Sequence, residues 1–275
     1  MSENGLNQAV IARSLGVSSS LISQWLKGSY KGDVATFETK LKSFMGNYSK
    51  RDLKEVESVV MTNDLRMTHF IIDEAIIGRE MCLIYGEAGS GKTTAVKEYV
   101  KKHPEAVLIE VIPGMSLKSF LKKLCFELGV NGANSNEEMI YAISEELKRR
   151  EALIIIDEAE NLTTKALEAI RRVWDFSKTP IALVGTYSVI RNLKGRSGEL
   201  LQLYTRISGK WEFRGLNDKE FEELFGDISK DIAKYTRHFR RAMNIYKKAI
   251  RLASMQNKNV NAGFVKAASE MVILD

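Results

Sequence analysis

The sequence predicts an α/β protein in three parts: a small all-helical domain, a parallel-sheet core and a helical lid. From Met81 onward, short apolar runs alternate with helical patterns, which is typical of a parallel sheet whose strands are joined by helices. After Leu216 the pattern is helical only. We therefore expect domains at residues 1–48, 49–215 and 216–275, with a polar, turn-prone linker at 46–51.

The expected strands of the core are apolar runs at residues 81–85, 106–111, 152–157 and 181–184. Helical patterns separate or follow them at residues 93–102, 116–128, 136–150 and 164–176. An amphipathic segment at 64–77 leads into the core. The lid is expected to form helices at 218–225, 230–255 and 261–272, and the pattern leaves open whether the second is one helix or two.

The first domain has the pattern of a helix-turn-helix. Residues 9–15 predict a short helix, Gly16 and Val17 a turn, and Ser18 the cap of a second helix that Gly28 ends. The run QAVIARSLGVSSSLISQWLKG resembles the phage-repressor type of this motif. Such motifs place the start of the second helix in the major groove of DNA. This resemblance implies base contacts from Ser19, Ser20 and Gln24, and phosphate contacts from Lys27, Tyr30 and Lys31. A helical hairpin used only for packing is the alternative.

Charge and composition exclude several classes of protein. The chain has 275 residues and a formal charge of +6. Residues 1–50 account for +3 and residues 230–275 for +7, so the centre carries −4. No apolar run approaches the roughly 18 residues that a membrane span needs. The start has no secretory pattern, and the two cysteines form no CxxC pair. We expect a cytoplasmic protein without a membrane partner.

The strongest motif is GEAGSGKT at residues 86–93, which matches the phosphate-binding loop (P-loop, or Walker A motif) GxxxxGK[ST] between an expected strand and an expected helix. Its glycines let the backbone surround phosphates, and the helix start offers free N–H groups to them. Lys92 is expected to reach the β- and γ-phosphates of ATP and Thr93 to ligate Mg²⁺. The expected nucleotide-binding residues are Gly86, Glu87, Ala88, Gly89, Ser90, Gly91, Lys92, Thr93 and Thr94.

A second signal is the apolar run at 153–156, which ends in Asp157 and Glu158. A buried strand that ends in two carboxylates is typical of a site in which Asp157 holds Mg²⁺ and Glu158 activates the attacking water. An apolar strand followed by Asp-Glu is common by itself. Its place in the chain after the P-loop favours the functional interpretation and predicts an ATPase.

Weaker candidates complete the catalytic set. Thr186, which follows the strand at 181–184, is expected to sense the γ-phosphate or the water. Arg206 is a candidate for neutralising transition-state charge in a neighbouring subunit. Arg240 or Arg241 in the lid is a candidate for contacting the nucleotide phosphates. A strand-end threonine and ordinary surface arginines are the alternatives.

Together these segments resemble the AAA+ ATPases, and among them the Mu B-like target-DNA activators of transposition. The resemblance includes the N-terminal motif, the P-loop, IIIDEAE at 154–160, ALVGTYSVIRNL at 182–193, LYTRISGK at 203–210 and AIRLASM at 249–255. Thr186 stands where that family usually has asparagine, and Arg237-His238-Phe239 precede the lid arginines where a glycine is usual.

The resemblance implies a homo-oligomer, a helical filament or ring, that ATP assembles on double-stranded DNA with little sequence preference. It also implies a transposase partner, active sites at subunit interfaces and an Arg206 that acts across them. The loops facing the filament axis would then contact DNA phosphates through Lys118, Arg191, Lys194 and Arg196. Two other functions stay open: a helicase-loading ATPase, and a nucleotide-switched helix-turn-helix transcription regulator.

Overall fold

The computed structural model describes residues 8–30, 32–42, 59–194 and 200–273. The chain forms two compact units, Met1–Val60 and Met61–Asp275. The expected linker at 46–51 lies outside the described residues.

The first unit packs short helices around a small apolar core. Helix α1 (Gln8–Leu15) and helix α2 (Ser19–Leu26) are joined by a turn in which Gly16 has a φ of 65°, and residues 34–42 are also helical. Ser18 caps α2 as the sequence predicts, because its side chain accepts a hydrogen bond from Leu21 N–H. The core of this unit consists of Ile11, Ala12, Ile22, Phe37 and Leu41.

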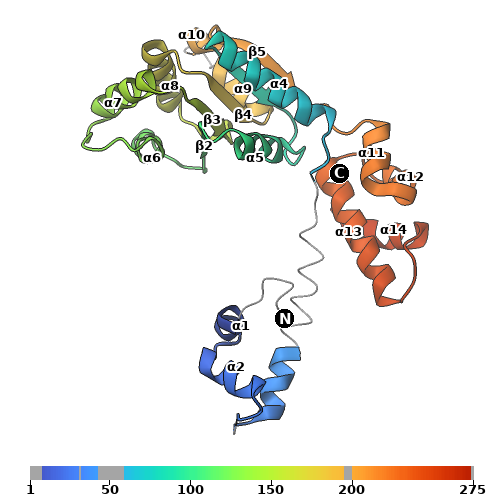
Figure 1. Cartoon of the computed structure of the whole chain (residues 1–275). Helices are drawn as coiled ribbons and strands as arrows, with labels where there is room; N and C mark the ends of the chain where they lie inside the picture. Colours follow the sequence, from blue (N-terminus) through green and yellow to red (C-terminus); the bar gives the residue numbers. More distant parts are fainter. Residues whose placement is uncertain (1–7, 31, 43–58, 195–199, 274–275) are drawn as a thin grey trace. The chain divides into compact units, whose positions relative to one another are not determined.

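The second unit is built on a five-stranded parallel sheet (Figure 1). Its strands are β1 (Met81–Tyr85), β2 (Ala106–Glu110), β3 (Leu153–Asp157), β4 (Ile181–Gly185) and β5 (Ile207–Glu212). The order is β2-β3-β4-β1-β5, and every neighbouring pair is parallel. The carboxyl ends of β3, β4 and β1 therefore lie side by side.

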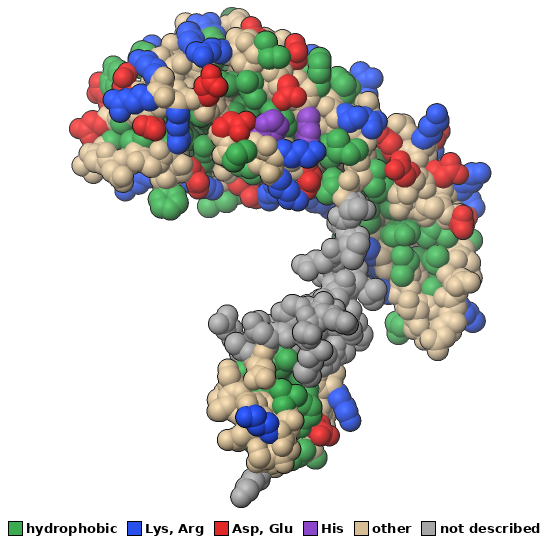
Figure 2. Space-filling view, viewed as in Figure 1, with side chains coloured by type: hydrophobic (Ala, Val, Ile, Leu, Met, Phe, Trp, Pro, Cys, Tyr) green, Lys and Arg blue, Asp and Glu red, His purple; other side chains and the backbone are tan. Residues whose placement is uncertain are grey.

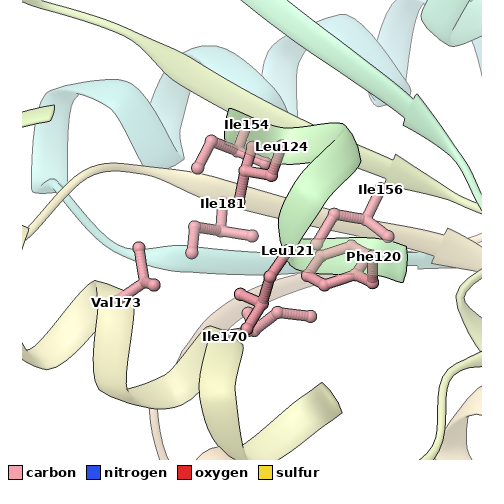
Figure 3. Close-up of a pocket in the computed structure, with 8 residues that line it drawn as sticks. All are labelled: Phe120, Leu121, Leu124, Ile154, Ile156, Ile170, Val173 and Ile181. Carbon is pink, nitrogen blue, oxygen red and sulfur yellow. The ribbon is translucent and has the colours of Figure 1, made fainter. Parts of the chain in front are cut away.

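Helices cover the sheet. They are α4 (Asn63–Gly78), α5 (Lys92–Lys102), α6 (Leu117–Leu128), α7 (Asn136–Arg149), α8 (Thr164–Ser177), α9 (Tyr187–Lys194) and the short α10 (Leu201–Tyr204). The main core cluster joins α6, α7 and α8 to the sheet. Figure 3 shows side chains of α6 and α8 directed toward those of β3 and β4. All eight labelled side chains are apolar, so this space is a packing interface, with no polar group to orient a ligand.

The lid has a core of its own, made by α11 (Asp218–Phe225), α12 (Ser229–Ala233), α13 (Phe239–Met255) and α14 (Ala262–Ser269). The expected helix at 230–255 is two helices, because the backbone leaves the helical conformation before His238, the extended N-cap of α13. The junction with the α/β core is fixed by Asp64. Its buried carboxylate accepts hydrogen bonds from Trp211 Nε1 and from the N–H groups of Arg214 and Gly215.

Strand β5 is absent from the sequence prediction. It is an edge strand with alternating partly buried and exposed residues, and Gly209 and Lys210 interrupt the apolar pattern. Buried strands of a parallel sheet are recognised in a sequence as continuous apolar runs, and β5 has no such run. No helix in the described part of the chain is long and apolar enough to span a bilayer.

Candidate nucleotide-binding site

The P-loop connects the end of β1 to the start of α5, as the motif requires. Gly89 has a φ of 80° and Gly91 a φ of 108°, conformations that side chains disfavour. At Gly86 a Cβ atom would lie 2.7 Å from the Cβ of Phe213, so only glycine fits there. These glycines allow the loop to curve tightly between β1 and α5.

Lys92 lies inside this loop. Its side chain is 7% exposed, and Nζ donates hydrogen bonds to the carbonyl oxygens of Gly86 (3.1 Å) and Glu87 (2.6 Å). Burial lowers the pKa of Lys92, while the charges of Glu160 and Asp157 oppose the shift. The ammonium is thus held where the loop converges, in position for the phosphates of a nucleotide.

The start of α5 is an anion site by its geometry. Most described helices have a side-chain cap, for example Ser116 on α6 and Thr163 on α8. No described side chain caps α5, whose N-cap is Gly91. Its first N–H groups have no intrahelical acceptor and carry the positive end of the helix dipole. Phosphate is the ligand that such an end favours.

Asp157 and Thr93 supply oxygen ligands of the kind that Mg²⁺ prefers. Asp157 is 2% exposed, and its Oδ2 has no hydrogen-bond partner among the described residues. Burial raises the Asp157 pKa, and the nearby Thr93 hydroxyl and the N–H of Glu158, which donates to Oδ1 at 2.9 Å, oppose this shift. The described residues contain no cluster of three or more metal-binding side chains. One carboxylate and one hydroxyl suit Mg²⁺, which usually completes its shell with phosphate and water.

Glu158 stands at the mouth of the site. Its backbone is left-handed, with φ 57° and ψ 37°, and it begins the 3₁₀ turn η1 (Ala159–Asn161). Burial and the neighbouring charges of Glu160 and Asp157 raise its pKa. A carboxylate with a raised pKa next to the phosphate position is suited to accept a proton from water.

Glu160 has no role predicted from the sequence, yet it lies close to Lys92 and Thr186 in the structure. Its Oε1 accepts a hydrogen bond from Thr186 N–H (3.1 Å), and its Oε2 is buried without a described partner. Among the charges that act on Lys92, that of Glu160 has the largest effect on the pKa. The available signal was the second glutamate of DEAE, two residues beyond Glu158.

Thr186 lies at the end of β4, beside Glu160, as its expected position requires. Its Oγ1 accepts a hydrogen bond from Ser188 N–H (3.4 Å) at the start of α9. The Gly185 position before it admits no side chain, since a Cβ there would lie 2.2 Å from Glu160 Oε2.

The lid meets the P-loop through the start of α13. Arg240 lies over Gly89, where an added Cβ would be 2.9 Å from its Nε, and its charge acts on Lys92. Arg240 is therefore a direct candidate for contacting the nucleotide phosphates. His238, which the sequence analysis did not assign, also contacts the loop: its Nε2 lies 2.8 Å from the carbonyl oxygen of Ala88.

Arg206 is not part of this cluster. It directly precedes β5, which is parallel to β1. Arg206 therefore lies at the amino ends of the strands, whereas the P-loop lies at their carboxyl ends. Its Nε is 3.4 Å from Asp175 Oδ1, and its guanidinium lies over the Trp174 ring. This placement excludes contact with the nucleotide of its own chain. It fits both alternatives of the sequence analysis, an arginine held by a salt bridge and an arginine that acts in another subunit.

Most of the expected DNA-contacting side chains that the structure describes are exposed; Tyr30 is instead partly buried against Phe37 in the core of the first unit. Ser19, Ser20, Gln24 and Lys27 are exposed on or just after α2. In the second unit, Lys118 is exposed on α6, and Arg191 and Lys194 are exposed on α9. Lys31 and Arg196 lie outside the described residues.

Comparisons with known proteins identify the family of the chain. Residues 76–193 match the AAA domain family. The chain is 30% identical over 215 residues to the Mu-like prophage FluMu DNA transposition protein B of Haemophilus influenzae, covering 76% of this chain and 75% of that protein. It is 25% identical over 280 residues to the ATP-dependent target DNA activator B of Escherichia phage Mu, covering 96% and 90%.

The fold is also that of known AAA+ proteins. The structure of Aeropyrum pernix ORC2 with ADPNP and ADP matches with a TM-score of 0.59 at 18% identity, over 78% of this chain and 68% of that one. Aeropyrum pernix ORC1 in complex with DNA matches with a TM-score of 0.54 at 15% identity, over 77% and 66%. With its P-loop, its carboxylate-ended β3 and its lid, the chain belongs to the Mu B-like family of AAA+ transposition proteins.

Proposed function

We propose that this protein hydrolyses ATP to ADP and phosphate and uses ATP to assemble on double-stranded DNA with little sequence preference. The assembly selects target DNA and activates a transposase. The observation that carries this proposal is that Lys92, Asp157 and Glu158 lie in one site. Two relatives of the chain are named ATP-dependent target DNA activators.

In the proposed reaction, the P-loop N–H groups and Lys92 bind the phosphates while Thr93 and Asp157 hold Mg²⁺. Bound Mg²⁺ neutralises charge on the β- and γ-phosphates. Glu158 accepts the proton of the attacking water, and Thr186, beside Glu160, lines the position of that water. Arg240 contacts the phosphates from the lid. Arg206 of another copy completes the charge around the transferred group.

DNA binding is proposed for two regions, the exposed start of α2 and the basic residues of α6 and α9. On the face of the second unit seen in Figure 2, basic and acidic side chains are interspersed. Contacts would therefore come from local groups of lysine and arginine. Phosphate contacts carry no sequence information, so affinity should depend strongly on salt.

The test is negative-stain electron microscopy of the full chain with DNA of unrelated sequences and a non-hydrolysable ATP analogue. We expect filaments or rings on every DNA, and none without nucleotide. Lys92→Ala is the matched control, because it should lose the nucleotide-dependent assembly while its DNA-binding side chains remain. Monomers under all nucleotide and salt conditions would contradict the proposal.

A further inference from the structure

We propose that Glu160 is a positioning residue that couples DNA contact on α9 to the hydrolytic centre, and that Asn192 is the link between them. The inference rests on the proposed DNA contacts of Arg191 and Lys194. It goes further because it names the route by which those contacts alter ATP hydrolysis.

The link consists of two hydrogen bonds that tie α9 to η1. The N–H of Thr186, directly before α9, donates to Glu160 Oε1 at 3.1 Å. From the second turn of α9, Asn192 Nδ2 donates to the carbonyl oxygen of Glu160 at 2.9 Å. Both the side chain and the backbone of Glu160 are therefore held by this one helix region.

On the catalytic side, Glu160 shares its turn with Glu158. The turn is tightly packed: Ala159 is fully buried, and Glu160 Oε2 approaches Gly185 so closely that no side chain fits there. A displacement of Glu160 must therefore move the backbone that aims Glu158. Misplacement of a catalytic group by about 1 Å can reduce a rate by roughly 100-fold.

On the DNA side, Asn192 lies between two exposed cations of α9. Arg191 precedes it, with Nη2 donating to Ser188 Oγ at 2.7 Å, and Lys194 follows at the end of the helix. Phosphates that bind Arg191 and Lys194 would act on the helix on both sides of Asn192. The hydrogen bond from Asn192 joins this basic segment directly to the catalytic turn.

The test compares Asn192→Leu with Asn161→Leu. Leucine has the same branching at Cγ as asparagine but cannot donate a hydrogen bond. Asn161 belongs to the same turn, yet its Nδ2 donates to Val111 O (3.4 Å), near the end of β2, and not to α9. For wild type and both variants, we would measure DNA affinity by fluorescence anisotropy, and kcat and KM for ATP with and without saturating double-stranded DNA.

Asn192→Leu is expected to keep its DNA affinity within about twofold, because Arg191 and Lys194 remain. Its DNA-free kcat should also stay within about twofold, because the Thr186 N–H still holds the Glu160 side chain. It should lose most of the DNA-dependent rise in kcat, with KM unchanged, whereas Asn161→Leu should respond to DNA as wild type does. A purely structural role would instead lower kcat with and without DNA in the same proportion.

Three results would overturn the inference, and they are distinguishable. If the wild-type protein does not bind DNA, the proposed function fails and the coupling fails with it. If wild type binds DNA and its kcat does not change, DNA binding stands and the coupling is wrong. If Asn192→Leu is stimulated as strongly as wild type, or if Asn161→Leu loses stimulation equally, the route through Asn192 is wrong.

Discussion

Glu158 shows how one backbone conformation determines which carboxylates the site contains. A left-handed φ of 57° is unfavourable for a residue other than glycine, by about 1 kcal/mol or more. At this position it reverses the chain after β3, so that η1 returns Glu160 to the end of β4. The motif Asp-Glu-Ala-Glu thereby places three carboxylates around Lys92.

The first prediction concerns Glu158→Gln. Glutamine keeps the size of the side chain but cannot accept the proton of water, so we expect nucleotide affinity within about threefold of wild type and kcat lower by about 100-fold or more. The control is Glu110→Gln, an exposed carboxylate at the end of the neighbouring strand β2 that pairs with Lys97. ATP turnover and nucleotide titration measure both. Unchanged turnover in Glu158→Gln would refute its assignment as the base.

The second prediction concerns the two cysteines. Cys82 is 1% exposed in β1, and burial raises its pKa to about 12. The thiolate is the reactive form, so at pH 8 the native protein has almost none of it at this position. Burial also raises the pKa of Cys125, which is 7% exposed. We expect neither thiol to react with a disulfide reagent until the protein is denatured, when both should react. Rapid labelling of the native chain would contradict this burial.

At the level of secondary-structure elements, the sequence predicts those strands and helices that have a clear hydrophobic pattern. Four strands and their helices lie within a few residues of their expected positions, because each is a buried apolar run or an amphipathic helix with an evident cap. Strand β5 was missed because an edge strand needs only partial burial. The break before α13 was left open, because it depends on the lid's tertiary contacts.

In the site, too, features carried by a local sequence pattern are predictable, and features that depend on tertiary contacts are not. The P-loop and Asp157-Glu158 are contiguous motifs, and they were found. Glu160 and His238 were not, because their roles depend on which distant backbone groups they meet: Thr186 N–H for Glu160 and Ala88 O for His238. Spacing along the chain contains no information on such contacts until the strand order and the lid position are known.

The third prediction concerns the contact between His238, at the start of α13 in the lid, and the P-loop. His238→Ala removes the hydrogen bond to Ala88 O and weakens docking of α13 and Arg240 on the P-loop. A neutral hydrogen bond contributes about 1 kcal/mol, so we expect nucleotide Kd to rise roughly fivefold. His103→Ala is the matched control, since His103 stacks on Tyr99 and pairs with Glu105, away from the P-loop. Equal affinities of the two variants would show that the His238 contact does not stabilise the bound nucleotide.

At the scale of the whole molecule, the parallel sheet separates the candidate nucleotide site from Arg206, because they lie at opposite ends of its strands. The carboxyl ends of the strands carry the P-loop and the carboxylates. The amino ends carry Arg206 and, on the same tryptophan ring, Lys178. Lys178 Nζ lies 3.9 Å from the centre of the Trp174 ring, on which Arg206 also rests, and the Trp174 indole donates to Arg79 O. In the proposed assembly, if copies join head to tail, these cations would face the phosphates and carboxylates of another copy.

The last prediction tests that assembly by complementation. Lys92→Ala leaves Arg206 intact but weakens nucleotide binding, and Arg206→Ala does the reverse; each alone is expected to have little DNA-supported ATPase activity. In an equal mixture, the P-loop of one variant meets the arginine of the other at about a quarter of randomly formed head-to-tail interfaces, so activity near a quarter of wild type should return. Mixing Lys92→Ala with the double variant is the control and should restore nothing. If the first mixture is no more active than its components, Arg206 does not act across subunits.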